Sequence, residues 1–248
     1  MKVSIITTCK NSAATIEDTI KSVISQDYTS IEYIVIDGQS VDGTIQIIQK
    51  YRDNLSVFLS ESDHGFYYAL NKGISLATGE VIGILNSDDF YPSSTIISNV
   101  IDVFTREQAD AVYGDLSYVD RIDTSKVIRK WVSGKYTDGD FLGGWMPPHP
   151  TFFVKKSVYT QFGVFNTGFK SAADYEIMLR FIHKHKIKLA YLPELIVLMR
   201  IGGTSNVSLA NRIKANLEDR NAWTINGLTP RPWTLFLKPL RKIRQFFY

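Results

Sequence analysis

The sequence predicts an α/β protein whose sheet is mostly parallel and doubly wound, with helices on both faces. Strand-like and helix-like apolar patterns alternate through residues 1–114 of the 248-residue chain. Residues 81–85 are apolar at nearly every position, as in a strand buried on both faces. Polar residues follow four of the predicted strands, where the ligand crevice of such a sheet lies. These observations together predict a site along one edge of the sheet.

The composition is that of an ordinary globular protein, 44% hydrophobic and 21% charged. A net charge of +3 is too small to argue for nucleic acid as a partner. The single cysteine, Cys9, excludes an internal disulfide and a cysteine-based metal site, and we expect it to be a packing residue in a reducing compartment. No apolar run approaches the roughly 20 residues that cross a bilayer, and no signal-peptide pattern precedes the first strand. We therefore expect a cytoplasmic protein.

The elements of the first half follow from apolar periodicity and from residues that start or end helices. Strands are predicted at 2–8, 31–36, 55–59, 81–85 and 111–113. Helices are predicted after a cap at Asn11 or Ser12 (with Ile16, Ile20, Val23 and Ile24 on one face), at 44–51, at 66–77 and from Pro92 and Ser93. We expect Asp42 to cap the second of these helices.

The alternation breaks after Gly114. The pattern there predicts a hairpin of 116–119 with 126–131, a mobile or ligand-ordered loop at 132–148, and further elements at 151–154, 157–162, 172–181 and 196–199. No repeat or linker is present. We therefore predict one domain over 1–228, with specialised halves at 1–114 and 115–228, and a separate tail at 229–248.

Two adjacent carboxylates, Asp88 and Asp89, follow the apolar run 81–85. A fully buried strand does not carry two charges, so they are expected at its carboxyl end. Their mutual repulsion predicts a hard divalent cation between them, carrying a phosphorylated substrate. The alternative is a helix-capping aspartate ahead of Pro92.

Six short segments, in consistent order over about residues 1–206, resemble family 2 glycosyltransferases, which have the GT-A fold. They are 3–8, 34–44, 69–89, 149–153, 173–176 and 202–205. The variant with Asp63-His64-Gly65 and Asn71-Lys72-Gly73 is similar to bacterial enzymes that build exopolysaccharide, colanic-acid-like or O-antigen units. The resemblance implies an inverting transfer from a nucleotide-diphosphate sugar, expected to be UDP-linked, to a hydroxyl of a glycan or of a polyprenyl-diphosphate-linked acceptor.

The resemblance also implies a set of donor-binding residues. They are Thr7, Thr8, Asp37, Lys72, Asn86, Ser87, Asp88 and Arg200, with Mg²⁺ or Mn²⁺ at Asp88 and Asp89. Asp37 is expected to accept a hydrogen bond from the nucleotide base, and its alternative is a turn aspartate before Gly38. The alternative for Lys72 is a solvated helix residue, and for Asp63 it is a helix cap. The alternative for Arg200 is a residue of a plain loop beside Gly202.

On the acceptor side, the resemblance makes Asp174 the general base that takes the proton from the acceptor hydroxyl. An aspartate at a helix amino end is also a favourable capping residue, which is the alternative. Glu176 is the weaker candidate. His149 and Trp145 are expected to line the acceptor side, with a structural role as the alternative for His149.

Two other functions stay open on the sequence alone. A sugar nucleotidyltransferase also combines such a sheet with metal-binding aspartates, but it needs a glycine-rich phosphate loop after the first strand, and residues 7–12 contain no glycine. A non-catalytic, membrane-associated nucleotide-binding protein is the second alternative. Its one indication is Asn86, which stands where the resembled family has an aspartate.

The tail, residues 231–248, mixes basic and large apolar residues and contains no acidic residue. Such a segment suits the interface of an anionic bilayer. It predicts peripheral binding to the inner face of the cell membrane. The alternative is a tail that packs on its own domain or on another subunit.

Overall fold

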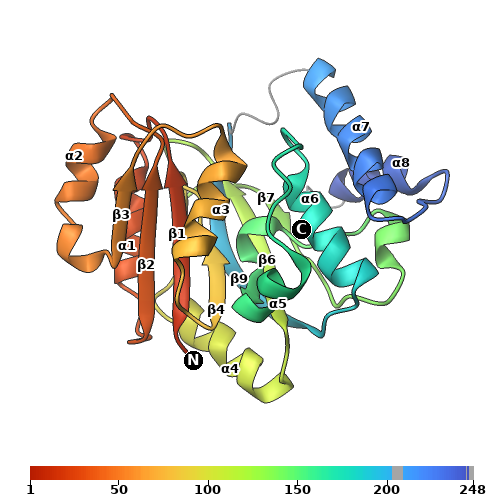
Figure 1. Ribbon diagram of the computed structural model, residues 1–248, viewed down its shortest axis with the longest axis horizontal. Coiled ribbons are helices and arrows are strands. Elements are labelled where there is room, and N and C mark those ends of the chain that lie inside the picture. The colour runs from red at the N-terminus through yellow and green to blue at the C-terminus, as the bar shows by residue number, and fades with distance from the viewer. Residues whose placement is uncertain (203–208, 244, 246–248) are drawn as a thin grey trace.

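The computed structural model describes residues 1–202, 209–243 and 245, and the side chains of residues 1–202, 216–241 and 245. Within these residues, nine strands form one sheet in the order β3-β2-β1-β4-β8-β6-β9-β5, with β7 paired to β6 (Figure 1). The strands are β1 (Val3–Cys9), β2 (Ile31–Asp37), β3 (Val57–Ser60), β4 (Val81–Ile84), β5 (Asp89–Phe90), β6 (Ala111–Val119), β7 (Val127–Trp131), β8 (Phe153–Lys155) and β9 (Leu189–Arg200).

Helices connect these strands and extend the chain beyond β9. They are α1 (Ile16–Ile24), α2 (Thr44–Gln49), η1 (Arg52–Asn54), α3 (Phe66–Leu76), α4 (Ile96–Glu107), η2 (Asp140–Gly143), η3 (His149–Thr151), α5 (Lys156–Phe162), α6 (Ala173–Met178), η4 (Leu179–Lys184), α7 (Leu209–Ile225) and α8 (Thr234–Ile243). No described helix has both the length and the apolar character that crossing a membrane requires.

The sheet is parallel in its first half and mixed in its second. β3, β2, β1 and β4 are parallel neighbours, as the alternation of strands and helices predicts. β8 then pairs antiparallel with both β4 and β6, and β6 pairs antiparallel with β7 and parallel with β9. The predicted α/β class with helices on both faces is confirmed, and the parallel arrangement applies to the half that carries the predicted donor site.

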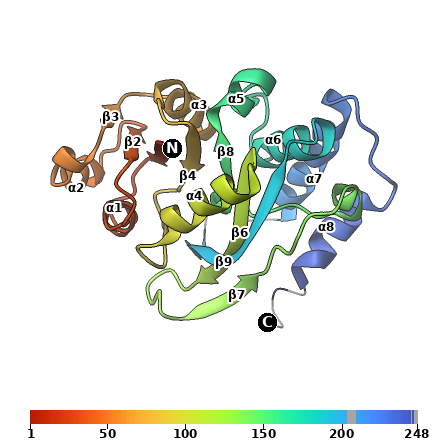
Figure 2. The same cartoon turned by 90° about the horizontal axis from the view of Figure 1, so that it is seen from below.

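Two hydrophobic cores cover the two faces of the sheet, because successive strand residues point to opposite sides. Ile6 packs with α3, α5 and α6, whereas its neighbour Ile5 packs with α1 and α4. Figure 2 shows these two groups of helices on opposite faces. The apolar residues of each helix face the sheet. Ile24 is an exception to the predicted α1 face, since it is 37% exposed.

Two predicted helix starts are wrong. Helix α1 begins at Ile16, not after a cap at Asn11 or Ser12, because the Ser12 carbonyl closes a turn by accepting the N–H groups of Thr15 and Ile16. Helix α4 begins at Ile96, not at Pro92, because Asp89 and Phe90 are first drawn into β5 by pairing with β9. The start of α4 depends on the long-range pairing of β5 with β9, which cannot be predicted from the spacing of apolar residues.

The segment 132–148, predicted to be mobile or ordered by ligand, is packed in this structure. Phe141 is fully buried, and its ring contacts those of Tyr136 and Trp145. Helix α8 also docks on this segment, since Thr234 Oγ1 donates to the Leu142 carbonyl at 2.7 Å. Aromatic packing therefore orders a segment whose glycines and prolines predicted a loop.

Candidate active site

Four parallel strands bring their carboxyl ends to one edge of the sheet (Figure 1). The register pairs Cys9 of β1 with Asp37 of β2, and Asp37 with Ser60 of β3. On the other side of β1, Ile6 pairs with Ile84, so the segment after β4 leaves the sheet beside the end of β1. The convergence predicted from the strand ends is confirmed, and this edge forms the floor of the candidate site.

Asp88 and Asp89 occupy different environments although they are adjacent in sequence. Asp89 opens β5, pairs with Met199 of β9 and is fully buried. Asn86 Nδ2 donates to Asp89 Oδ2 at 2.8 Å, and no described residue bonds to Oδ1. Burial raises the pKa of the Asp89 carboxyl well above its usual value, and the nearby charge of Asp88 raises it further. Asp89 has no exposed surface at all, whereas Asn86 and Asp88 are partly exposed, so we favour these two residues over Asp89 as metal ligands.

Asp88 lies in the turn before β5 and is partly exposed. Burial raises the pKa of its carboxyl, while the positive charges of Arg121 and Arg200 act in the opposite direction. A partly open carboxylate suits a hard cation, because Mg²⁺ binds through one or two carboxylates and takes its other ligands from water and substrate phosphates. The described residues contain no cluster of three or more His, Cys, Asp or Glu that could hold a metal.

The neighbouring amide adds a second oxygen. Asn86 Oδ1 is buried and takes no hydrogen bond from a described residue. An amide oxygen is a suitable ligand for a hard cation, although it brings no charge. Asp88 and Asn86 therefore carry the kinds of oxygen atom that fit a hard divalent cation.

Arg200, predicted to bind the diphosphate, is 4% exposed at the end of β9. Its Nη1 donates to the Asp88 carbonyl at 2.8 Å, and its Nη2 donates to Asp18 Oδ2 at 2.5 Å. The guanidinium also lies 4.8 Å from the centre of the Phe90 ring. Arg200 thus ties the turn that carries Asp88 to α1 and β5, which makes it a positioning residue.

Ser87 is held within the same turn. Its hydroxyl lies 2.9 Å from that of Ser12, and its carbonyl accepts a hydrogen bond from Thr15 Oγ1 at 2.9 Å. The loop after β1 and the turn after β4 are therefore joined directly.

Asp42, predicted to cap α2, accepts the N–H of Thr44 at 3.1 Å and also that of Ala13 at 3.0 Å.

The two threonines of β1 differ because neighbouring strand residues point to opposite sides. Thr7 is fully buried, and its hydroxyl lies 3.2 Å from that of Tyr33. The predicted donor contact of Thr7 is therefore not supported by its position. Thr8 is 6% exposed, and no described residue bonds its Oγ1. Thr8 keeps its place as a candidate.

Asp37 is fully buried and its carboxylate is saturated within the protein. Oδ1 accepts from Ser40 Oγ at 2.5 Å and from Cys9 Sγ at 3.5 Å. Oδ2 accepts from the Ser40 N–H at 3.0 Å and from Ser60 Oγ at 2.6 Å. These four bonds use the capacity of a carboxylate. Asp37 therefore fixes the ends of β1, β2 and β3, and its predicted bond to a nucleotide base has no free acceptor.

Lys72 lies on α3 and forms an ion pair with Glu61, which follows β3. Lys72 is about a quarter exposed and Glu61 about half exposed. The ammonium group of Lys72 already has an anionic partner, so the predicted contact with the donor would have to compete with Glu61.

Asp174 lies in the first turn of α6 and is partly exposed. Its Oδ1 accepts the N–H of Tyr175 at 2.8 Å, and no side-chain hydrogen bond caps this helix. Glu218 of α7 holds the preceding loop instead, accepting the N–H of Ser171 at 2.9 Å and of Ala172 at 3.0 Å. No local pattern in the sequence predicts this role of Glu218, because its partners lie more than forty residues away along the chain.

The charge of Asp174 acts on two side chains from other elements. Burial raises the pKa of Tyr67, on α3, and the charge of Asp174 raises it further. Burial lowers the pKa of His149, and the charge of Asp174 opposes this. His149 also packs edge-on against Phe165, with ring centres 5.5 Å apart.

Tyr118 of β6 lies on the same row of the sheet as Asp89, because Met199 of β9 pairs with both residues. Burial raises the pKa of its hydroxyl, the charge of Arg129 lowers it, and the charges of Asp89 and Asp174 raise it. Arg129 lies over the same ring, 3.8 Å from its centre.

The family model described as "Glycosyl transferase family 2" matches residues 4–173, which is more than half of the chain. The chain belongs to glycosyl transferase family 2. This family 2 chain is 29% identical over 186 residues to an uncharacterized glycosyltransferase of Mycobacterium tuberculosis, covering 72% of this chain and 68% of that protein. It is 27% identical over 208 residues to a PGL/p-HBAD biosynthesis glycosyltransferase of Mycobacterium bovis, covering 82% and 78%.

Solved structures show the same GT-A fold. Staphylococcus aureus TarS 1–349 in complex with UDP-GlcNAc has a TM-score of 0.68 and 18% identity, with 91% of this chain and 65% of that chain covered. The mannosyltransferase PcManGT of Pyrobaculum calidifontis, in complex with GDP-Man and Mn²⁺, has a TM-score of 0.68 and 22% identity, with 95% and 68% covered. The chain spans 44% of a longer TarS structure.

Trp145, predicted to line the acceptor side, and Glu176, the weaker candidate for the general base, both have structural roles in the family 2 chain. Trp145 is 6% exposed, its Nε1 donates to the Ser133 carbonyl at 2.9 Å, and its ring is enclosed by other aromatic rings. Glu176 is 2% exposed and bonds both Arg180 Nε at 2.8 Å and Asn226 Nδ2 at 2.9 Å. Both side chains are occupied inside the core, so neither is available to an acceptor.

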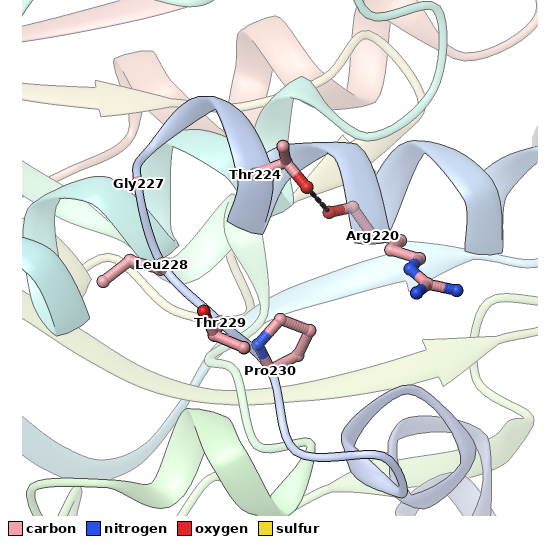
Figure 3. Close-up of a pocket in the computed structure, with 6 residues that line it drawn as sticks. All are labelled: Arg220, Thr224, Gly227, Leu228, Thr229 and Pro230. Atoms are coloured by element: carbon pink, nitrogen blue, oxygen red, sulfur yellow. Dashed lines mark hydrogen bonds between the residues drawn. The ribbon is translucent and has the colours of Figure 1, made fainter.

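A hollow of about 410 Å³ lies elsewhere in the molecule, at the end of α7 (Figure 3). It is lined by Arg220, Thr224, Gly227, Leu228, Thr229 and Pro230. None of these residues belongs to the strand ends or to the amino end of α6. The candidate site of this glycosyltransferase is the sheet edge, and this hollow is not part of it.

Proposed function

We propose that this glycosyltransferase moves a sugar from a UDP-sugar, with inversion, to a hydroxyl of a glycan or lipid-linked oligosaccharide of the cell surface. The observation that carries the proposal is the partly exposed Asp88 at the edge where the parallel strands end, in a chain that belongs to glycosyl transferase family 2. The names of relatives support the pathway class, since one is a PGL/p-HBAD biosynthesis glycosyltransferase and another is a putative teichuronic acid biosynthesis glycosyltransferase of Bacillus subtilis. A bound UDP-GlcNAc in a TarS structure supports a uridine donor.

In this proposal, Asp88 and the oxygen of Asn86 would hold a Mg²⁺ or Mn²⁺ ion. Bound there, the ion would supply charge neutralisation for the departing diphosphate. Arg200 keeps the Asp88 turn in place through the Asp88 carbonyl. Asp89 supports the turn from the interior, through its bond with Asn86.

Asp174 takes the proton from the acceptor hydroxyl. The hydroxyl oxygen then forms a bond to the anomeric carbon while the bond from that carbon to the diphosphate oxygen breaks, which inverts the configuration. The charged Asp174 is the base, and the lowered pKa of His149 keeps the imidazole neutral at pH 7, able to hydrogen-bond a sugar hydroxyl.

A donor screen tests this function. Release of nucleotide is measured from a panel of UDP-sugars and GDP-sugars, with Mn²⁺ and with EDTA. We expect metal-dependent release from at least one UDP-sugar, because water can replace the acceptor slowly beside the general base. If no donor is turned over and UDP binds no more tightly with Mn²⁺ than without it in calorimetry, the proposed function is wrong.

We also propose that α8 brings the enzyme to an anionic membrane surface, where a lipid-linked acceptor would lie. One side of α8 is docked on the domain, since Lys238 Nζ donates to Asp219 Oδ2 at 2.6 Å and Arg241 Nε donates to the Gly143 carbonyl at 2.9 Å. The other side carries Trp233, Phe236 and Leu240, which are 52%, 73% and 54% exposed. Packing on the domain and binding to a membrane, the two roles predicted for the tail, are thus compatible.

The exposed side has the pattern of an interfacial helix. Trp233, Phe236 and Leu240 follow a spacing of three and four residues, which places them on one stripe. Residues 231–248 include basic residues and no acidic one, so no residue of this segment carries a negative charge that an anionic surface would repel.

Vesicle co-sedimentation tests the membrane proposal. Replacing Trp233, Phe236 and Leu240 together with Ser is expected to reduce binding to anionic vesicles about tenfold or more, because burying each large apolar side chain contributes about 1.5–3 kcal/mol. The control replaces Val41 and Ile122 with Ser, two residues that are 90% and 94% exposed on other loops. Equal pelleting of all three proteins contradicts the proposal.

A further inference from the structure

The helix that carries the proposed general base has no capping side chain of its own. Ala172 stands at the N-cap of α6, and Tyr175 stands three residues later, where a capping box has Glu or Gln. The first N–H groups of a helix need partners, and a helix end without them frays. Asp174 is the second residue of α6, so its position depends on contacts from elsewhere in the molecule.

Glu218 of α7 supplies such a contact. Its Oε2 accepts the N–H groups of Ser171 and Ala172 at 2.9 Å and 3.0 Å, and its Oε1 accepts the N–H of Lys170 at 3.2 Å. The hydroxyl of Ser171 also donates to Oε2, at 3.0 Å. One carboxylate therefore holds three successive N–H groups at the start of α6, where a negative charge is also favourable.

The part of α7 that carries Glu218 is itself anchored, because α7 packs against both α6 and α8 (Figure 1). Trp223 of α7 is fully buried, and its Nε1 donates to the hydroxyl of Tyr175 at 2.8 Å. Asp219, the neighbour of Glu218, accepts a hydrogen bond from Lys238 of α8 at 2.6 Å, and both of these side chains are largely buried. The ammonium of Lys238 also lies 3.7 Å from the centre of the Tyr175 ring. Glu218 therefore projects from a firm support.

We propose that Glu218 is a positioning residue that holds Asp174 within reach of the acceptor hydroxyl. This inference rests on the proposed function, in which Asp174 is the general base. A base must lie within hydrogen-bond reach of the proton that it takes, and a displacement of about 1 Å can slow a reaction about 10²-fold. Helix α7 lies outside residues 4–173, so this contact comes from a segment that the family model does not include.

Three variants test this inference through two measurements in Mn²⁺, release of UDP from the UDP-sugar that wild type turns over and calorimetry of UDP. Glu218→Ala removes the acceptors of all three N–H groups. Glu218→Gln keeps one oxygen, which can still accept the N–H groups of Ser171 and Ala172. The control is Asp110→Ala. Asp110 is also a partly exposed carboxylate that accepts an N–H from a distant segment, that of Lys188 at 3.0 Å, but it lies before the amino end of β6.

Glu218→Ala is expected to lower kcat about 10–100-fold, because Asp174 loses its fixed position. The donor KM and the affinity for UDP should change less than about twofold, because Glu218 lies on α7 and not at the strand ends. Glu218→Gln should keep at least about a third of the wild-type kcat, since an amide oxygen replaces the main acceptor. Asp110→Ala should keep the wild-type kcat, and thermal unfolding should show a cooperative transition for every variant.

A double variant separates positioning from a general loss of stability. In an Asp174→Asn background, Glu218→Ala should cost little further turnover, because both substitutions act through the same side chain. The inference is overturned, and the proposed function stands, if Glu218→Ala keeps the wild-type kcat, if it loses UDP binding together with kcat, or if its effect is as large in the Asp174→Asn background as in wild type. If wild type turns over no donor and UDP binds no more tightly with Mn²⁺ than without it, the inference and the proposed function are both overturned.

Discussion

Replacing Asp174 with Asn is expected to slow sugar transfer by about 10²–10⁴-fold, the usual contribution of a general base. The amide cannot take the proton from the acceptor hydroxyl, but it keeps the size of the side chain. Donor affinity should be nearly unchanged, because Asp174 belongs to α6 and not to the strand ends of the donor half. Turnover with the donor found in the screen, and calorimetry of UDP with Mn²⁺, measure the two quantities.

A structural role of Asp174 would give a different result. An acidic residue in the first helical turn stabilises the helix by about 0.3–1 kcal/mol, so a merely structural variant would lower stability slightly and leave turnover in place. Asp53→Asn, which makes the same change at an exposed aspartate in the first turn of η1, is the matched control. Loss of UDP binding together with turnover in Asp174→Asn would rule out its assignment as the base.

Replacing Asp88 with Asn is expected to remove the Mn²⁺ dependence of UDP binding and to abolish transfer. Asp88 is the partly exposed carboxylate at the sheet edge, and its loss leaves the cation without a charged protein ligand. The fold should be little affected. Burial already raises the pKa of this carboxyl, so a neutral side chain is accepted at the position. Calorimetry of UDP with and without Mn²⁺, and thermal unfolding, measure these effects.

Asp89→Asn is the matched comparison, one residue away. Asp89 is fully buried and its pKa is raised well above the usual value, so the neutral amide should preserve stability or increase it. Metal-dependent UDP binding should persist, because the side chain has no exposed surface. If Asp89→Asn loses the Mn²⁺ dependence while Asp88→Asn keeps it, our assignment of the metal ligand is reversed.

Much of the site was predictable because parallel strands end at one edge. The polar residues after β1, β2, β3 and β4 share that edge, as alternation alone indicates. Which side chain faces the edge was less predictable. Thr7 points into the core towards Tyr33, and Asp89 turns inward because Met199 of β9 pairs with it. These orientations depend on partners that are distant in sequence.

The sequence by itself determined the order of strands and helices from β1 to β4, the α/β class and the identity of the chemical groups at the sheet edge. Periodicity and the ends of apolar runs are local properties, so they can be read from neighbouring residues. Only the tertiary structure decided that Asp37 is saturated, that Glu218 holds the start of α6, and that Asp88 and Asp89 have separate environments. Each of these depends on hydrogen bonds and burial between segments far apart in the chain. Such long-range contacts produce no periodic pattern in the sequence from which they could be predicted.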